Sequence, residues 1–360
     1  MPSLRLLADD LTGALDTSAE FVGMVGPLDV VWSAEAAPQA SFAIDSGTRE
    51  LGDEEAFAVV REMAPRLEGA GIAYKKIDSL LRGPWVAELN VCLQTGLWDA
   101  CIVAPAFVHQ GRATREGRQY ARVQDGSWSA VGDTILTQLH ALGLEARLAR
   151  PAAALEGGVS VFDAETEEDL AGIAEIGRRY AGRLLWCGSG GLAQALACGS
   201  DVSVHARLEP PVLGIFGSDH PATAAQLSMC EGIVIESVDI SRDIDRIERA
   251  LADGVAFVQL TTSGSFSRGE AARHFSQALA RLSGSIDPPK TLVIAGGETL
   301  KALALAVGAR ALQVLGRLEP GLPKSVIKGG RWAGLDVISK SGAFGRADLW
   351  SKLLRRNGLI

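Results

Sequence analysis

Short apolar runs alternate with amphipathic stretches along almost the whole chain, and this alternation restricts the fold more than any other feature of the sequence. The apolar runs predict buried strands, and the amphipathic stretches between them predict helices. Strands that alternate with helices are usually joined by crossover connections, which place them parallel to one another. The sequence therefore predicts an α/β fold with mainly parallel sheets flanked by helices.

The predicted elements continue from one end of the chain to the other. In the first half, strands are predicted at residues 3–8, 28–32, 41–45, 73–78, 100–104, 158–162 and 183–187, and helices at 12–25, 53–68, 84–96, 132–142, 166–181 and 190–198. In the second half, strands are predicted at 212–217, 233–239, 255–261, 290–295, 311–316 and 335–340, and helices at 221–231, 241–252, 269–283, 297–307 and 346–355. Residues 107–130, rich in Gly, Arg, Gln and Ser, interrupt the alternation and predict a hairpin or an excursion over the sheet edge.

The chain has 360 residues, which is too long for one typical hydrophobic core. Its alternating pattern is lost around residues 199–211, where Gly199–Asp201 and Glu209–Pro211 flank a segment without a clear period. We therefore predict two α/β domains, covering residues 1–205 and 206–360, each with a mainly parallel sheet flanked by helices.

Charge and composition exclude several classes of function. The net charge is −8 and no basic run exceeds two residues, which argues against a nucleic-acid groove. The sequence shows neither a signal peptide nor an apolar run of about 18 residues that would span a membrane. The five cysteines are scattered and form no CxxC pair, and the five histidines lack the spacing of zinc ligands. These features predict a cytoplasmic protein without partners in membranes or nucleic acids.

Two adjacent carboxylates, Asp9 and Asp10, follow the first predicted strand directly. Thr12 and Gly13 come next, at the start of the first predicted helix. In open α/β sheets, ligands bind outside the carboxyl ends of the strands, so this position indicates a binding site. The alternative is that Asp10 or Thr12 only caps the helix.

Two further strand ends carry a similar mixture of side chains. Lys76, Asp78 and Arg82 lie within the segment Lys75–Gly83, and Arg49 closes the segment Asp45–Arg49. Arginine suits a carboxylate, lysine supplies a compact positive charge, and an aspartate at a strand end can accept a proton or hold a metal. A surface ion-pair cluster and an ordinary polar turn are the alternatives. Because parallel strands bring their carboxyl ends to one edge, we expect a pocket for a polyhydroxy acid.

Other polar groups extend the two predicted sites. Arg112 and Thr114, in the interrupting segment, would close over the ligand if that segment is not simply a solvated hairpin. Glycine-rich loops join strands to helices, and such loops can cradle phosphates or form plain tight turns. Their number in the second half favours a nucleotide, although a Walker motif and protein-kinase signatures are absent. The loops are Gly188–Gly191, Gly217–Ser218, Gly296–Gly297 and Ser341–Gly345 after Lys340.

This ordered set of motifs resembles the four-carbon acid sugar kinase family, and the resemblance spans nearly the whole chain. Leu80 stands where that family usually has Thr. The matching segments of the first half are Ala8–Ala14, Lys75–Gly83, and Ala104–Ala106 with Gly111, Arg112 and Thr114. Those of the second half are Gly217–Ser218 with Thr223 and Gln226, Gly296–Thr299, Pro320–Pro323 and Lys340–Gly345.

The resemblance implies an ATP-dependent kinase whose N-terminal domain binds a sugar acid such as threonate, erythronate or 3-oxo-tetronate, and whose C-terminal domain binds ATP. It implies that substrate contacts come from Asp9, Asp10, Arg49, Lys76, Asp78 and Arg82, to which we add Arg112. It implies that nucleotide contacts come from Ser218, Gly296, Gly297, Glu298, Thr299 and Gly342, to which we add Lys340. A homo-oligomer is compatible with the sequence.

The sequence also supports a hypothesis for phosphoryl transfer, in which positioning and charge stabilisation dominate. Arg82 and Arg49 would hold the substrate carboxylate, Asp78 or Asp10 would orient or deprotonate the acceptor hydroxyl, and Lys76 would neutralise developing charge. Mg²⁺ would bridge phosphate oxygens, through Glu298 or an aspartate. Three alternatives stay open: a kinase for a different hydroxy acid, which Leu80 favours, a nucleotide-dependent oxidoreductase, and a non-catalytic sugar-acid sensor.

Overall fold

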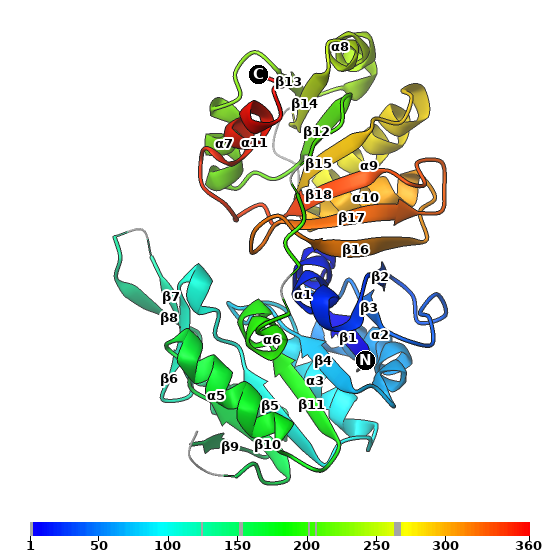
Figure 1. Ribbon diagram of the computed structural model, residues 1–360. Helices are drawn as coiled ribbons and strands as arrows, with labels where there is room; N and C mark the ends of the chain where they lie inside the picture. Colours follow the sequence, from blue (N-terminus) through cyan, green and yellow to red (C-terminus); the bar gives the residue numbers. More distant parts are fainter. Residues whose placement is uncertain (1–2, 124, 151–153, 201, 206, 263–267) are drawn as a thin grey trace. The chain divides into compact units, whose positions relative to one another are not determined.

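The computed structural model describes residues 3–123, 125–150, 154–200, 202–205, 207–262 and 268–360. The chain divides into two compact units, Met1–Val202 and Ser203–Ile360, and each is an α/β unit (Figure 1). Asp201 and Ala206, which belong to the predicted boundary region, lie outside the described residues.

The first unit is built on a fully parallel sheet in the order β2-β3-β1-β4-β11-β5-β10-β9. Its central strands are short and buried on both faces, which explains why they appear in the sequence as continuous apolar runs. The strands are β1 (Leu4–Ala8), β2 (Leu28–Val31), β3 (Phe42–Asp45), β4 (Ile72–Lys76), β5 (Ala100–Ala104), β9 (Ala146–Ala149), β10 (Gly158–Phe162) and β11 (Leu184–Gly188).

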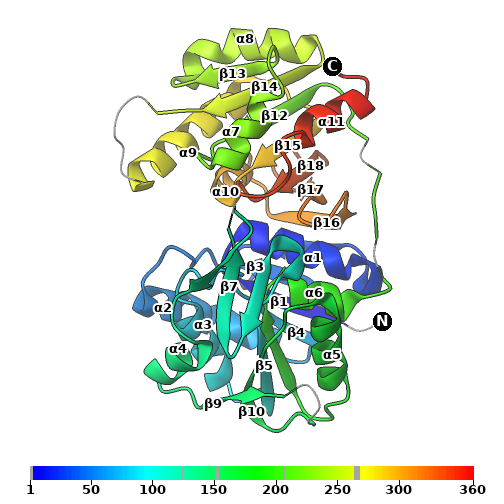
Figure 2. The ribbon, with the colours of Figure 1, turned by 90° about the vertical axis from the view of Figure 1, so that its left-hand side faces the viewer.

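Helices cover both faces of this sheet. On one face α6 packs beside both α1 and α5, and α2 and α3 pack together as a separate pair (Figure 2). The helices are α1 (Leu11–Val25), α2 (Asp53–Met63), α3 (Trp85–Gln94), α4 (Ile135–Ala141), α5 (Glu167–Arg178) and α6 (Gly190–Ala197), with short 3₁₀ turns at Ala64–Leu67 and Val108–Gln110.

The register of the parallel strands places several strand ends in one row. Ala8 is paired with both Asp45 and Lys76, and Gly188 is paired with both Lys76 and Ala104. Because the polar loops follow these residues directly, the sheet brings the loops to one edge. The predicted convergence of strand ends is therefore a property of the fold.

The segment that interrupts the alternation forms a separate antiparallel sheet of three strands, β6 (Arg112–Arg115), β7 (Arg118–Arg122) and β8 (Trp128–Val131). The hairpin prediction is confirmed. Strand β9 was not predicted, because its sequence Ala-Arg-Leu-Ala is short and only partly buried.

The second unit has a sheet in the order β13-β14-β12-β15-β18-β17-β16, parallel from β13 to β18. Strand β17 pairs antiparallel with both β18 and β16. It was missed in the sequence, since it begins at a proline and carries lysines at both ends. The strands are β12 (Val212–Phe216), β13 (Val234–Ser237), β14 (Val255–Leu260), β15 (Thr291–Ala295), β16 (Ala311–Arg317), β17 (Pro323–Lys328) and β18 (Asp336–Lys340).

Helices α9 and α10 pack together on one face of the second sheet, with α8 beside α9, and α7 packs against α11 (Figure 1). The core on the α11 side is aromatic: the Phe216 ring lies 5.0 Å from that of Phe257 and 6.0 Å from that of Trp350. The helices are α7 (Pro221–Ser228), α8 (Ile240–Ala252), α9 (Arg268–Ser285), α10 (Gly297–Ala306) and α11 (Leu349–Arg356).

Two exclusions made from the sequence can be compared with the structure. All five cysteines are described and free, and four of them are buried. Within the described ranges, every helix is too short or too polar to cross a bilayer.

Candidate active site

Arg49 forms ion pairs with three carboxylates in a cluster of charged side chains beyond strands β3, β1 and β4. Its guanidinium forms a bidentate pair with Asp9, in which Nε lies 2.7 Å from Oδ2 and Nη2 lies 2.8 Å from Oδ1. Its Nη1 lies 2.7 Å from Oδ2 of Asp10, and its Nη2 lies 3.8 Å from Oδ1 of Asp78. Arg49, in the loop after β3, therefore links that loop to the loops that follow β1 and β4.

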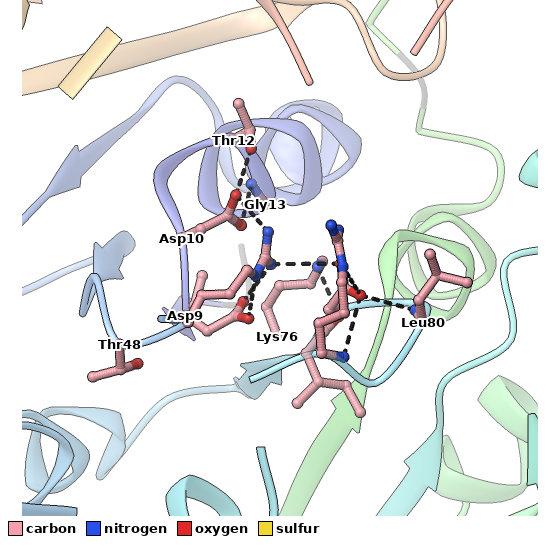
Figure 3. Close-up of polar contacts among 12 residues, drawn as sticks. Asp9, Asp10, Thr12, Gly13, Thr48, Lys76 and Leu80 are labelled. Carbon is pink, nitrogen blue, oxygen red and sulfur yellow. Dashed lines mark hydrogen bonds and ion pairs between the residues drawn. The ribbon is translucent and has the colours of Figure 1, made fainter. Parts of the chain in front are cut away.

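The two adjacent carboxylates have different tasks. Asp10 is the N-cap of α1: it accepts hydrogen bonds from the Gly13 amide at 2.9 Å and the Thr12 hydroxyl at 2.5 Å (Figure 3). Asp9 is buried and faces Arg49. The capping interpretation is thus confirmed for Asp10, which also lies within the charged cluster. A role of this position in ligand binding stays a prediction.

Asp78 binds Arg82 in a second bidentate pair, with Nε–Oδ2 at 2.8 Å and Nη2–Oδ1 at 2.7 Å. The Leu80 amide donates to the same carboxylate at 3.0 Å, which folds the segment after β4 into a tight loop. Gly83, at φ +79°, closes this loop against the Arg49 backbone, since a Cβ there would lie 2.9 Å from the Arg49 carbonyl oxygen. The loops after β3 and β4 are therefore packed directly on each other.

Lys76 is buried between the carboxylates. Its ammonium group donates to the Ile77 carbonyl oxygen at 2.7 Å, and its charge acts on both Asp9 and Asp78. A Cβ at Gly13 would lie 3.1 Å from Nζ, so the glycine leaves room for the lysine beside the first turn of α1.

The surrounding cations keep the carboxylates ionised. Burial would raise the pKa of Asp9, but the charges of Arg49 and Lys76 outweigh it and lower the pKa below its usual value. Burial likewise opposes ionisation of Asp78, and hydrogen bonding to Arg82 together with the charge of Arg49 holds its pKa far below the usual range. Asp78 is accordingly a strong hydrogen-bond acceptor and a weak proton acceptor.

Arg112 begins β6 and differs from the other two arginines: among the described residues, its guanidinium donates to backbone carbonyls alone, those of Gln110 at 2.9 Å and Gly111 at 3.0 Å. The charge of Asp78 acts on it from nearby. The hairpin that carries Arg112 is fastened to the site by Gln119, whose amide donates to the Ser79 carbonyl oxygen at 2.8 Å.

The second unit gathers its predicted nucleotide-binding residues at the carboxyl ends of β12, β15 and β18, which the register holds side by side. A Cβ at Gly342 would lie 2.2 Å from Oγ of Ser218, and one at Gly217 would lie 2.5 Å from Oγ1 of Thr299. The three loops are therefore packed closely enough to require glycine. Gly297 is the first residue of α10, and the side chain of Glu298 in its first turn is exposed.

Lys340 ends β18 at the edge of these loops. Its side chain is only 1% exposed, and Nζ donates to the carbonyl oxygens of Ser341 at 2.9 Å and Gly342 at 3.2 Å. Within the described part of the chain this ammonium group forms no ion pair, and burial lowers its pKa to about 8. A buried lysine beside glycine loops and a helix N-terminus is suited to a phosphate group.

The structure also shows buried polar residues near the cluster that were not among the predicted site residues, namely Gln119 and the linked pair Thr48 and Glu88. Their signal in the sequence is weak. Glu88 lies on the apolar helix α3, and an isolated carboxylate in an apolar helix is the only hint of a buried partner.

Comparisons with known proteins agree with this division of the chain. The family model of a sugar-binding N-terminal domain matches residues 4–138 and 127–196, and that of a nucleotide-binding C-terminal domain matches residues 213–349. A D-threonate kinase from Cupriavidus necator is 33% identical over 97% of this chain and 96% of the relative. Another D-threonate kinase, from Bordetella bronchiseptica, is 29% identical with the same coverage.

Solved structures share the fold. A protein of Salmonella typhimurium superimposes with a TM-score of 0.73 at 20% identity, covering 99% of this chain and 100% of that one. A Haemophilus influenzae protein gives a TM-score of 0.71 at 16% identity, covering 98% of this chain and 100% of that one. With both domain models matched in order and a relative of 33% identity along nearly the full length, the chain belongs to the four-carbon acid sugar kinase family.

Proposed function

We propose that this protein is an ATP-dependent kinase that phosphorylates a hydroxyl group of a small sugar acid, most simply one of four carbons. The observation that carries the proposal is the cluster of ionised aspartates and cations at the strand ends of the first unit. In this proposal residues 1–205 bind the sugar acid and residues 206–360 bind the nucleotide. The family and the D-threonate kinase relatives support it.

The pairing within the cluster changes the expected roles of the arginines. Arg49 already binds Asp9 and Asp10, so its guanidinium has little capacity left for a substrate carboxylate. Arg112 forms no hydrogen bond or ion pair with a carboxylate of the described residues, and the Arg82 side chain is 62% exposed while bound to Asp78. We therefore assign the substrate carboxylate to Arg112 and Arg82, and give Arg49 the task of holding Asp9 and Asp10.

Ionised aspartates then receive the hydroxyl groups of the substrate. Asp78 accepts a hydrogen bond from the reacting hydroxyl and orients it, with Asp10 as the other candidate. A strong base is not required, because the transition state of phosphoryl transfer is loose and develops little charge on the nucleophile. Lys76, buried beside Asp9 and Asp78, offsets negative charge in the site.

In the second unit, Lys340 and the loops containing Ser218, Gly296–Thr299 and Gly342 would hold the phosphates of ATP. The described residues contain no group of three or more His, Cys, Asp or Glu side chains arranged for a metal. The exposed carboxylate of Glu298, in the first turn of α10, would be one ligand of Mg²⁺, and phosphate oxygens and water would supply the others. When bound, the ion would neutralise phosphate charge.

The test is a coupled assay of ADP release with a panel of acids: D-threonate, erythronate, 3-oxo-tetronate and longer hydroxy acids. We expect ADP release that depends on one acid of the panel. Titration with ATP and Mg²⁺ should change the fluorescence of the seven tryptophans, whereas NADH should not. Binding of NADH in place of ATP would favour an oxidoreductase, and ATP binding without turnover on any acid would favour a sensor.

A further inference from the structure

We propose that Thr48 and Glu88 are positioning residues of the sugar-acid site, and that the buried ion pair between Glu88 and Lys75 keeps Arg49 in place. This inference rests on the proposed function, since it assigns a task within that site. None of the three residues is among the expected substrate contacts. All three are buried beneath the cluster around Arg49.

The ion pair lies inside the first unit, between strand β4 and helix α3. Nζ of Lys75 lies 2.6 Å from Oε2 of Glu88, and both side chains are fully buried. Nζ also donates to the Lys76 carbonyl oxygen at 3.0 Å. Burial alone would lower the pKa of Lys75, but the charges of Glu88 and Asp9 raise it, so the lysine stays protonated.

Glu88 uses its other oxygen to hold the loop after β3. The Thr48 hydroxyl donates to Oε1 of Glu88, and the same hydroxyl oxygen lies 2.7 Å from Oγ of Ser46. Ser46 in turn donates to the carbonyl oxygen of Ala8 at 2.8 Å, through both its amide and its hydroxyl. The loop is thus fixed at both the helix α3 side and the end of strand β1.

Arg49 is the next residue of this fixed loop. Its amide donates to the Asp9 carbonyl oxygen at 3.2 Å, and its side chain binds Asp9 and Asp10. Because the Thr48 backbone fixes the starting point of the Arg49 side chain, any shift of Thr48 moves the guanidinium relative to both aspartates. The buried contacts therefore hold the Arg49 guanidinium against Asp9 and Asp10, two carboxylates of the proposed sugar-acid site.

A purely structural explanation accounts poorly for this arrangement. A buried ion pair stabilises a fold weakly compared with apolar side chains of similar volume. A charged Glu88, however, is a strong acceptor for the Thr48 hydroxyl, and Lys75 fixes its carboxylate in one orientation. The ion pair thus orients the loop after β3, which a pair of apolar side chains would not do.

The experiment compares Thr48→Val, which removes the hydroxyl at nearly constant volume, with Thr48→Ser, which keeps it. For Thr48→Val we expect kcat/KM for the sugar acid to fall by roughly 10–100-fold, the effect of losing one hydrogen bond to a charged group. Thr48→Ser should recover most of this loss, and the KM for ATP should stay within about twofold in both. Equal kcat/KM in the Val and Ser variants would overturn the inference.

A second pair of variants removes the charges and varies only the acceptor. Lys75→Met with Glu88→Gln keeps an oxygen for Thr48, whereas Lys75→Met with Glu88→Leu does not. Lys75→Met with Glu88→Leu should reproduce the full loss seen with Thr48→Val. Lys75→Met with Glu88→Gln should lose less, because its neutral amide oxygen still accepts from Thr48, but as a weaker acceptor that no lysine orients. Comparable kcat/KM in the two double variants would contradict the inference. If Thr48→Val does not fold, the comparison of the two double variants replaces the comparison of Thr48→Val with Thr48→Ser.

A readout without substrate separates failure of this inference from failure of the proposed function. The Nε–H proton of Arg49, held by Asp9, should exchange slowly with water in nitrogen-edited NMR spectra, and an Arg49→Lys variant assigns the signal. We expect faster exchange in Thr48→Val than in Thr48→Ser. Identical exchange in both refutes the positioning role, even if no acid is phosphorylated by the unaltered protein.

Discussion

If Lys340 binds the phosphates of ATP, as proposed, the affinity for ATP should depend on pH. Its ammonium group is buried and donates to two backbone carbonyl oxygens, and burial lowers its pKa to about 8. If the protonated lysine is the form that binds phosphate, kcat/KM for ATP should follow its protonated fraction. That fraction falls from about nine-tenths at pH 7 to about one-tenth at pH 9, so kcat/KM should fall roughly tenfold.

The assay is the pH dependence of kcat/KM for ATP at saturating sugar acid and Mg²⁺. Lys340→Arg is the matched variant, because arginine stays charged throughout this range. It should remove the decline above pH 8, whereas Lys340→Met should lower kcat/KM at every pH. An alkaline decline that persists unchanged in Lys340→Arg would refute the assignment of Lys340 to the phosphates.

Three further predictions concern the first unit. Lys75→Met should lower the free energy of unfolding by about 3–5 kcal/mol, because it leaves the buried Glu88 without its ion-pair partner. Replacing both residues by methionine should lower the free energy of unfolding much less. Calorimetry of the two variants checks this, and equal losses would contradict it. Arg112→Met should raise the KM for the sugar acid by roughly 10–100-fold without changing that for ATP, and an unchanged KM for the acid would exclude Arg112 as its ligand. Because the pKa values of Asp9 and Asp78 are lowered in the folded protein, these residues stabilise the fold above about pH 4. This stabilisation is lost as the pH falls through their folded-state pKa values. The stability of Asp9→Asn, followed by circular dichroism during acid unfolding, should therefore depend less on pH than that of the unaltered protein.

Much of the fold followed from the sequence because buried parallel strands are continuous apolar runs. Strand β17 did not, since Pro323 and its lysines hide an antiparallel strand among parallel ones. Likewise β9, with Arg147 in a four-residue strand, has too few apolar residues to be detected. Such edge or antiparallel strands depend on pairing partners that are distant in the sequence.

The sequence predicted which charged residues lie together at the sheet edge, but not which of them form ion pairs with one another. Parallel topology alone places Asp9, Asp78 and Arg49 at one edge of the sheet. Which arginine each aspartate binds depends on side-chain packing, which the sequence does not show. Arg49, predicted together with Arg82 to hold the substrate carboxylate, has its guanidinium held by Asp9 and Asp10. The role of Glu88 could not be predicted from the sequence, because its partners, Lys75 and Thr48, lie in strand β4 and in the loop after β3.

The central claim is that ATP transfers a phosphoryl group to a hydroxyl of a small sugar acid bound by the first unit. Phosphorus NMR of a reaction containing the protein, ATP, Mg²⁺ and D-threonate or another four-carbon acid measures this transfer directly. We predict a new phosphomonoester signal that grows in step with ADP and is lost in Arg112→Met at low acid concentration. Inorganic phosphate as the only product, or ATP unchanged with every acid, would contradict the claim.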